Sequence, residues 1–151
     1  MTTMYPEMRY VKLDPEVPDL GYARSGDAGI DLYSMEDVEI APQGMVKVGS
    51  GVALEIPHGF YGQLVPRSGM ATERGITLIN TPGTIDESYR DEVKMALYNM
   101  STEMQCVGRM ERCAQVIIQP YAQVTPVEVD ELSETERGKG GFGSTGYRER
   151  L

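Results

Sequence analysis

The stretch Met45-Val-Lys-Val-Gly-Ser-Gly-Val-Ala-Leu-Glu-Ile-Pro-His-Gly-Phe-Tyr-Gly-Gln-Leu-Val65 decides the fold class. It holds three short runs of mostly alternating apolar residues, at 45–48, 52–56 and 60–65, and the turn formers of 57–59 separate the last two. A period of two between turn formers is typical of β-strands that bury one face. This stretch therefore predicts consecutive strands.

The same pattern recurs along the chain. Further runs lie at 9–13, 29–33, 38–40, 76–79, 93–99, 113–119 and 124–129. Turn formers separate them at the spacing of a sandwich or barrel. No window keeps a 3.6-residue apolar period, although Ser68 to Arg74 has the length of one or two helical turns. We therefore expect an all-β fold, a distorted jelly-roll β-barrel of short strands.

Length and composition divide the chain into a body and an arm. Its 151 residues correspond to one domain. Residues 131–136 are acidic and polar, and a glycine-rich segment follows them. We expect residues 1–132 to form the β-barrel and residues 133–151 a mobile C-terminal arm that belongs functionally to the same domain.

Charge and hydropathy exclude several classes of partner. The net charge of -9 argues against broad nucleic-acid binding, which needs many cations on backbone phosphates. No apolar run approaches the roughly 20 residues of a membrane span, and no signal-peptide stretch opens the chain. We expect a soluble, intracellular protein (in the cytoplasm, or the host cytoplasm if viral) without nucleic-acid or membrane partners. Cys106 and Cys113 lack zinc-site spacing, and we expect free thiols in the core.

The segment Arg137-Gly-Lys-Gly-Gly-Phe-Gly-Ser-Thr-Gly146 holds two cations, two hydroxyls and one aromatic ring. Glycines allow a backbone to approach phosphates closely, and successive N–H groups can surround the phosphate oxygens. Arg137 and Lys139 add positive charge, and Phe142 offers a face for stacking a base. The segment indicates a nucleotide site, although a glycine-rich terminus taken alone is more often a solvated tail.

Four upstream segments are richer in glycine and polar residues than a β core needs. They lie at 28–32, 66–71, 80–90 and 112–115. With the tail, and in this order, they resemble the five motifs of the trimeric, all-β dUTP pyrophosphatase (dUTPase) family. The resemblance spans nearly the whole chain and implies hydrolysis of dUTP to dUMP and pyrophosphate by in-line water attack at the α phosphorus. This reaction would limit uracil in DNA and supply dUMP for thymidylate synthesis.

The third segment, residues 80–90, is expected to recognise the nucleoside and to carry the catalytic base. An amide side chain, together with backbone groups of a hairpin, can match the hydrogen-bonding edge of uracil. We assign this amide to Asn80. By resemblance, Tyr89 lies beneath the deoxyribose and Asp86 deprotonates the attacking water. The implied substrate-binding set also includes Gly83, Thr84, Ile85 and Met95.

Two other segments are expected to face the phosphates. By resemblance, Arg67, Ser68 and Gly69 lie near the α and β phosphates, at the start of a helical turn that favours an anion. Gln115 would bind phosphate or water. Asp31 would help to hold a Mg²⁺ ion, through water, beside the triphosphate, because magnesium keeps several of its waters.

The arm would complete the site. By resemblance, Arg137 pairs with the γ phosphate and Phe142 stacks over uracil. Gly143, Ser144 and Thr145 would donate hydrogen bonds to the terminal phosphates. The family also implies a homotrimer whose shared active sites draw segments from more than one subunit, with dUTP as the small-molecule substrate.

Each assignment has a structural alternative. Ser68 could serve merely as a helix cap, and Arg67 could serve merely in a structural ion pair, without either residue binding substrate. Asp31 could bond backbone amides at a strand edge, and Gln115 could be a satisfied structural side chain. Asp91 stands where the family usually has glycine, so the hairpin there could be reshaped.

Two other functions compete with dUTP hydrolysis. An enzyme like the related dCTP deaminases would attack the base instead of the phosphate. A nucleotide-sensing or partner-binding module would keep the pocket without turnover. Release of ammonia or pyrophosphate separates these hypotheses.

Overall fold

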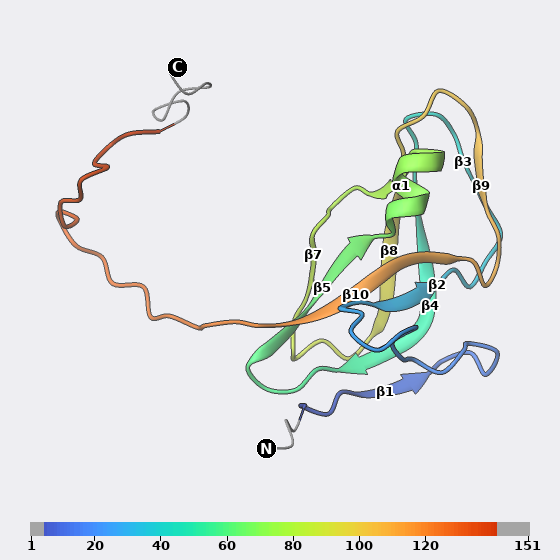
Figure 1. Cartoon of the computed structure of the whole chain (residues 1–151), viewed down its shortest axis with the longest axis horizontal. Coiled ribbons are helices and arrows are strands. Elements are labelled where there is room, and N and C mark those ends of the chain that lie inside the picture. Colours follow the sequence, from blue (N-terminus) through green and yellow to red (C-terminus); the bar gives the residue numbers. More distant parts are fainter. Residues whose placement is uncertain (1–4, 142–151) are drawn as a thin grey trace.

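The computed structural model describes residues 5–141, which form an antiparallel β fold with one short helix (Figure 1). The elements are β1 (Arg9–Lys12), β2 (Ile30–Tyr33), β3 (Val38–Ile40), β4 (Met45–Glu55), β5 (Phe60–Pro66), α1 (Ser68–Arg74), β6 (Ile76–Leu78), β7 (Gly83–Ile85), β8 (Glu92–Asn99), β9 (Gln105–Val107) and β10 (Arg112–Pro120). The expected all-β, jelly-roll-like fold is confirmed. Among these residues no helix is long and apolar enough to cross a membrane.

Two four-stranded sheets enclose the core. Their strand orders are β1-β4-β8-β6 and β2-β10-β5-β7, and β3 pairs with β9 apart from them. Strand β8 buries every second residue, including Val93, Met95 and Leu97, and the other sheet contributes Leu32 and Val116. Burying one such side chain stabilises the fold by about 1.5–3 kcal/mol. Met95, expected in the substrate-binding set, is fully buried in this core.

Strand β4 is one continuous strand that contains the apolar run at 45–48 and most of the run at 52–56, which the sequence pattern predicted as two strands. Its pairing with β8 is irregular between Gly49 and Ala53. Inside this irregularity the carboxylate of Glu92 accepts a hydrogen bond from the Gly51 N–H at 2.9 Å. The break in alternation therefore marks a bulge within one strand. The short strands β7 and β9 carry too few residues to show alternation, and the sequence did not predict them.

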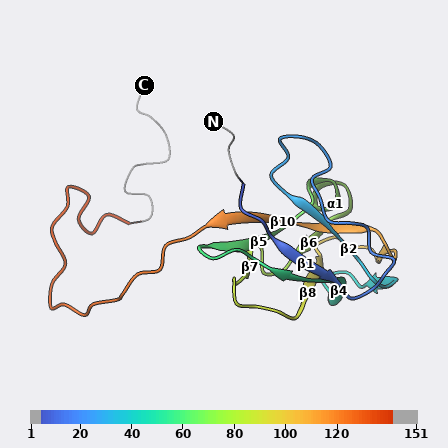
Figure 2. The same ribbon diagram turned by 90° about the horizontal axis from the view of Figure 1, so that it is seen from below.

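The strand expected over residues 124–129 is wrong. This segment has no regular structure, and Val124, Val127 and Val129 are 79%, 76% and 56% exposed. After β10 ends at Pro120, the chain leaves the barrel as an extended segment, which both views show (Figures 1 and 2). Alternation alone does not make a strand, because a strand needs a hydrogen-bonding neighbour, and none pairs with 124–129 among the described residues.

The two cysteines differ in their surroundings. Both are free, as expected. Cys113 is buried, and burial raises the pKa of its thiol to about 12. Cys106 is exposed on β9, so its expected place in the core is wrong. Strand β9 lies in the small two-stranded sheet, and Cys106 is on its outward-facing side.

Candidate functional site

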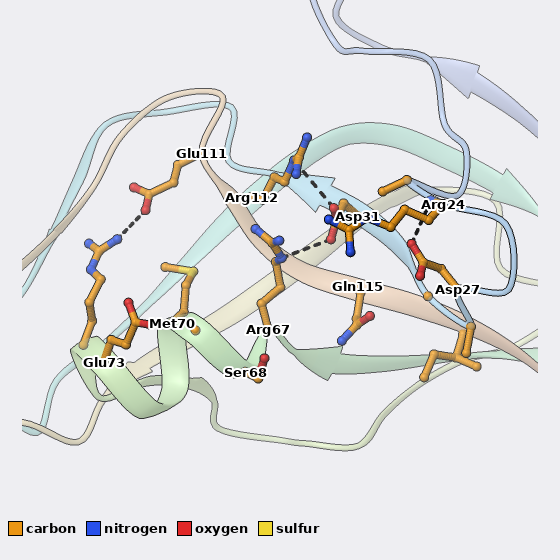
Figure 3. A pocket seen from close by; sticks show the side chains of 16 residues that line it. Arg24, Asp27, Asp31, Arg67, Ser68, Met70, Glu73, Glu111, Arg112 and Gln115 are labelled. Carbon is orange, nitrogen blue, oxygen red and sulfur yellow. Dashed lines mark hydrogen bonds and ion pairs between the residues drawn. The ribbon is translucent and has the colours of Figure 1, made fainter.

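A polar hollow of about 930 Å³ lies beside β2, β10 and the start of α1 (Figure 3). We call it the arginine hollow. It brings together Asp31, Arg67, Ser68, Gly69 and Gln115, which come from three separate segments of the sequence. The fold therefore gathers the expected phosphate-facing residues of one chain in one place.

Asp31 lies between two guanidinium groups in this hollow (Figure 3). Its Oδ1 is 3.1 Å from Nε of Arg67, and its Oδ2 is 3.5 Å from Nε of Arg112. Arg112 also lies over the ring of Tyr33, with its Cζ 5.8 Å from the ring centroid. A hydrogen bond to Tyr33 and the charge of Asp31 raise the pKa of Arg112. One carboxylate thus holds two cations beside a space open to an anion.

The start of α1 contributes backbone donors to the arginine hollow. Arg67 occupies the N-cap position in an extended conformation, and its side chain does not cap the helix. Ser68 and Gly69 follow as the first two helical residues, and both are exposed. The first N–H groups of a helix have no partner within it, so they can bind an oxygen ligand. Ser68 is therefore not the N-cap that the structural alternative required.

The Gln115 side chain occupies a space that exists because residue 29, next to β2, is a glycine. It lies on β10 opposite Asp31 of β2, and its Nε2 is 3.4 Å from the Pro66 carbonyl oxygen. A Cβ at position 29 would overlap Gln115 Oε1 and lie 2.9 Å from its Cδ. Gly29 therefore leaves the space that the amide of Gln115 occupies at the edge of the hollow.

A second, smaller hollow of about 190 Å³ lies beside β5, β7 and the loop before β8. We call it the tyrosine hollow. It is lined by Asn80, Gly83, Thr84, Ile85, Asp86 and Tyr89, together with Leu64, Val93 and Lys94. The residues expected to recognise the nucleoside therefore lie together, with the exception of the buried Met95.

Hydrogen bonds fix the loop that carries Asp86 and Tyr89. The Tyr89 N–H donates to the Asp86 carbonyl oxygen at 3.1 Å, which closes a turn. The Tyr89 hydroxyl donates to the Glu92 carbonyl oxygen at 3.0 Å. On the other wall, a Cβ at Gly83 would lie 3.2 Å from Nδ2 of Asn80, so glycine leaves room for this amide. Carboxylate, ring and amide are thus held around one small space.

Asp91 does not impose a left-handed backbone on the loop. The described non-glycine residues with positive φ are Gln43 and Met110. The Asp91 carboxylate instead accepts a hydrogen bond from the Glu92 N–H at 2.7 Å. The residue that replaces the family's usual glycine is therefore accommodated without strain of that kind.

Sequence reasoning missed Glu87, the residue after Asp86. The side chain of His58, in the turn between β4 and β5, is 93% exposed. Its Nδ1 nevertheless lies 3.0 Å from Oε1 of Glu87. The two residues are far apart in sequence and belong to no periodic pattern, so only the paired turns of the fold could reveal this contact.

One chain does not bring all the expected residues together. The two hollows share no lining residue. Arg137 lies on the segment that leaves the barrel, where its Nε donates to the Gly140 carbonyl oxygen at 3.0 Å. The expected residues Phe142, Gly143, Ser144 and Thr145 lie outside the described residues.

The side chains of the arginine hollow suit a metal ion that is held mainly by a bound phosphate ligand and water, and less by the protein. Residues 5–141 contain no group of three or more His, Cys, Asp or Glu side chains that could hold a metal. Asp27, Glu73 and Glu111 also line the arginine hollow, and Asp31, 18% exposed, is the carboxylate that pairs with Arg67 and Arg112 there. Mg²⁺ is commonly bound through one or two carboxylates, its own waters and substrate phosphates. Asp31 is therefore compatible with magnesium that is bound through water together with a polyphosphate.

The family and its curated members match nearly the full length of the chain. The family described as dUTPase matches residues 16–146. The deoxyuridine 5'-triphosphate nucleotidohydrolase of Nautilia profundicola is 48% identical over 140 residues, which cover 93% of this chain and 99% of that protein. The protein of the same name from Mycolicibacterium gilvum is 43% identical and covers 95% of this chain, with 97% of its own length matched.

Solved structures agree in fold. The Staphylococcus bacteriophage 80alpha dUTPase with dUPNHPP has a TM-score of 0.87 and 25% identity, over 94% of this chain and 99% of that one. A mutant dUTPase of phage phi11 of S. aureus, described with a structural Mg(II) ion, has a TM-score of 0.79 and 20% identity. It matches 85% of this chain and 100% of its own. Because the family match and the curated relatives cover nearly the whole sequence, the chain belongs to the dUTPase family.

Proposed function

We propose that this chain hydrolyses dUTP to dUMP and pyrophosphate with Asp86 as the base that activates water. Membership of the dUTPase family supplies the activity. The observation that carries the choice of base is the position of Asp86, the only carboxylate among the described residues that line the tyrosine hollow. It is exposed, so a water molecule can reach it. A base placed in this way contributes about 10²–10⁴-fold to a rate.

The tyrosine hollow would hold the nucleoside. The Asn80 amide offers both a donor and an acceptor to the edge of uracil. The Tyr89 ring, tied by its hydroxyl to Glu92, would lie against the deoxyribose. A 2'-hydroxyl or a base methyl group would overfill such a pocket, at a cost of about 1–3 kcal/mol. This cost would favour dUTP over UTP and dTTP.

The arginine hollow would hold the triphosphate. Arg67 and Arg112 face it as cations, and Ser68, Gly69 and Gln115 add polar donors. Asp31 would accept a hydrogen bond from a metal-bound water. Magnesium bound with the phosphates would neutralise negative charge there.

The chemical step would be an in-line displacement. Asp86 accepts a proton as the water oxygen forms its bond to the α phosphorus. The bond from that phosphorus to the bridging oxygen of the β phosphate breaks, and pyrophosphate leaves. Most of the catalysis in such transfers is positioning and charge stabilisation, which the fixed loop and the two arginines would supply.

The separation of the two hollows supports a homotrimer with shared active sites. Neither hollow of one chain contains both the base and the arginines. The segment after β10 leaves the barrel with Val124, Val127 and Val129 exposed, as expected of a segment that covers another subunit. The barrel ends at Pro120, so residues 121–132, expected within it, belong to the segment that leads away from it. We propose that residues 133–151 form an arm that closes over a site. The roles of Phe142, Gly143, Ser144 and Thr145 stay predictions.

The activity is tested by following pyrophosphate and ammonia with dUTP, dCTP, dTTP and UTP, each with and without magnesium. We expect pyrophosphate from dUTP with magnesium, and no ammonia from dCTP. UTP and dTTP should turn over about 5–150-fold more slowly, from the same pocket-filling cost. dCTP should also be slower, because its amino group donates where uracil accepts. The absence of pyrophosphate from dUTP with magnesium would contradict the proposed function.

A further inference from the structure

Glu87 bridges two turns that are distant in sequence. Its Oε1 lies 3.0 Å from Nδ1 of His58, and its Oε2 accepts a hydrogen bond from the Gly59 N–H at 2.7 Å. The side chain is only 25% exposed, whereas the residues on either side of it in the loop are exposed. One carboxylate therefore ties the loop between β7 and β8 to the turn between β4 and β5.

Tyr121, the first residue after β10, lines a hollow together with Glu87. Burial and the nearby Glu87 carboxylate raise the pKa of Tyr121. The Tyr121 N–H donates to the Gly59 carbonyl oxygen at 3.1 Å, so its backbone is fixed to the same turn. Hydrogen bonds from His58 and from the Gly59 backbone lower the pKa of Glu87. Glu87 is thus an ionised group that is bonded to the turn at 58–59 and lies in one hollow with Tyr121.

This tie is the main restraint on the loop that carries the proposed base. Among loop residues 86–91 in the described chain, Glu87 alone hydrogen-bonds beyond the loop and the first residue of β8. The other contacts are local, such as that from Arg90 Nη1 to the Glu87 carbonyl oxygen at 2.5 Å. A loop with few ties to its scaffold samples more conformations.

Asp86 forms part of the same wall. It lines the tyrosine hollow and also a neighbouring hollow of about 480 Å³, which Glu87 and Tyr121 line as well. Because Asp86 and Glu87 are consecutive, any movement of the Glu87 backbone is transmitted to Asp86. Asn80 lies on the other side of β7 in sequence and does not depend on this tie.

We propose that Glu87 is a positioning residue, which sets the place of the Asp86 carboxylate through its bonds to His58 and Gly59. The inference rests on the proposed role of Asp86. Loss of the tie should misplace the base by a fraction of an ångström or more. The nucleoside should still bind through Asn80 and through the Tyr89 ring, because the Tyr89 hydroxyl keeps its own hydrogen bond to the Glu92 carbonyl oxygen on β8. Turnover should therefore fall while substrate affinity stays, because misplacement on the order of 1 Å can cost about 10²-fold in rate.

The test compares Glu87→Ala and Glu87→Gln with the control Glu55→Ala. Glu55 ends β4 near the same turn and pairs only with Arg9, at 3.8 Å, among the described residues. The measurements are kcat and KM for dUTP with magnesium, and binding of the dUTP analogue dUPNHPP by calorimetry. We expect Glu87→Ala to lower kcat by about 10–100-fold with KM and analogue affinity nearly unchanged. Glu87→Gln keeps an acceptor for Gly59 and should lie between Glu87→Ala and the wild type, and Glu55→Ala should match the wild type.

Three outcomes separate this inference from the proposed function. A kcat of Glu87→Ala near the wild-type value, or a raised KM at unchanged kcat, would overturn it. If Glu87→Ala does not fold by circular dichroism, the near-isosteric Glu87→Gln decides by the same criteria. If Asp86→Asn keeps wild-type turnover, the base assignment itself fails, whereas loss of turnover in Asp86→Asn alone refutes only the role of Glu87.

Discussion

The space at Gly29 allows a sharp prediction about the arginine hollow. In Gly29→Ala the new Cβ would overlap Gln115 Oε1, with Cδ at 2.9 Å and Cγ at 3.1 Å. These atoms are the end of a flexible, half-buried side chain that can turn aside, so the cost should be near the lower limit for overpacking, about 1 kcal/mol. For a protein of this length, this cost lowers the unfolding temperature by roughly 2–4 °C. The amide should also leave its position at the hollow, so kcat/KM should fall to the level of Gln115→Ala.

The double variant tests the cause of the loss. In Gly29→Ala/Gln115→Ala the clashing atoms are gone, so the alanine at 29 should cost less than about 0.5 kcal/mol in that background. Stability is measured by urea unfolding and by thermal melts at one fixed protein concentration, because assembly contributes to both. Activity is measured by pyrophosphate release from dUTP. If Gly29→Ala destabilised the wild type and Gln115→Ala equally, Gln115 would not be the group that needs the space.

Three other predictions address stability, thiol chemistry and assembly. The pKa values of Glu87, Asp14 and Asp19 are lowered, so these groups stabilise the fold fully above their unfolded pKa near 4 and lose that contribution as the pH falls through the folded pKa values. The urea concentration at the unfolding midpoint should therefore decrease when the pH is lowered below about 4, and it should decrease less steeply in Glu87→Gln. At pH about 8, iodoacetamide should label the exposed Cys106 and spare Cys113, whose pKa burial raises to about 12; equal labelling by mass spectrometry refutes this. Equal mixtures of refolded Asp86→Asn and Arg67→Ala chains should regain about one quarter of the wild-type rate if sites are shared, and none if each site lies in one chain.

Much of the fold follows from local pattern. Alternation places most strands within a residue or two, and the segment Ser68 to Arg74 forms the helix that its length allows. Pattern fails where pairing decides. Residues 124–129 alternate but have no neighbour in the described chain, and β7 is a strand only because β5 pairs with it. The bulge in β4, where Glu92 of β8 accepts a hydrogen bond from Gly51, interrupts the alternation, so the sequence pattern shows one strand as two separate runs.

The site shows the same division. Ordered motifs identify Asp31, Arg67 and Gln115, and the fold places them in one hollow. Motifs cannot show that Asp31 holds both arginines, because that contact depends on the register of β2 with β10. Nor can they show the role of Glu87, whose partners His58 and Gly59 come from the turn between β4 and β5. Met95 falls in the core because β8 buries alternate residues there.

The central claim is that Asp86 is the base for dUTP hydrolysis. Its most direct measurement is single-turnover pyrophosphate release by the wild type and Asp86→Asn, with dUPNHPP affinity measured in parallel. The substitution keeps the size of the side chain and one acceptor oxygen but cannot accept the proton of water. We predict that the rate falls by about 10²–10⁴-fold while analogue affinity is retained. Wild-type turnover by Asp86→Asn would contradict the account.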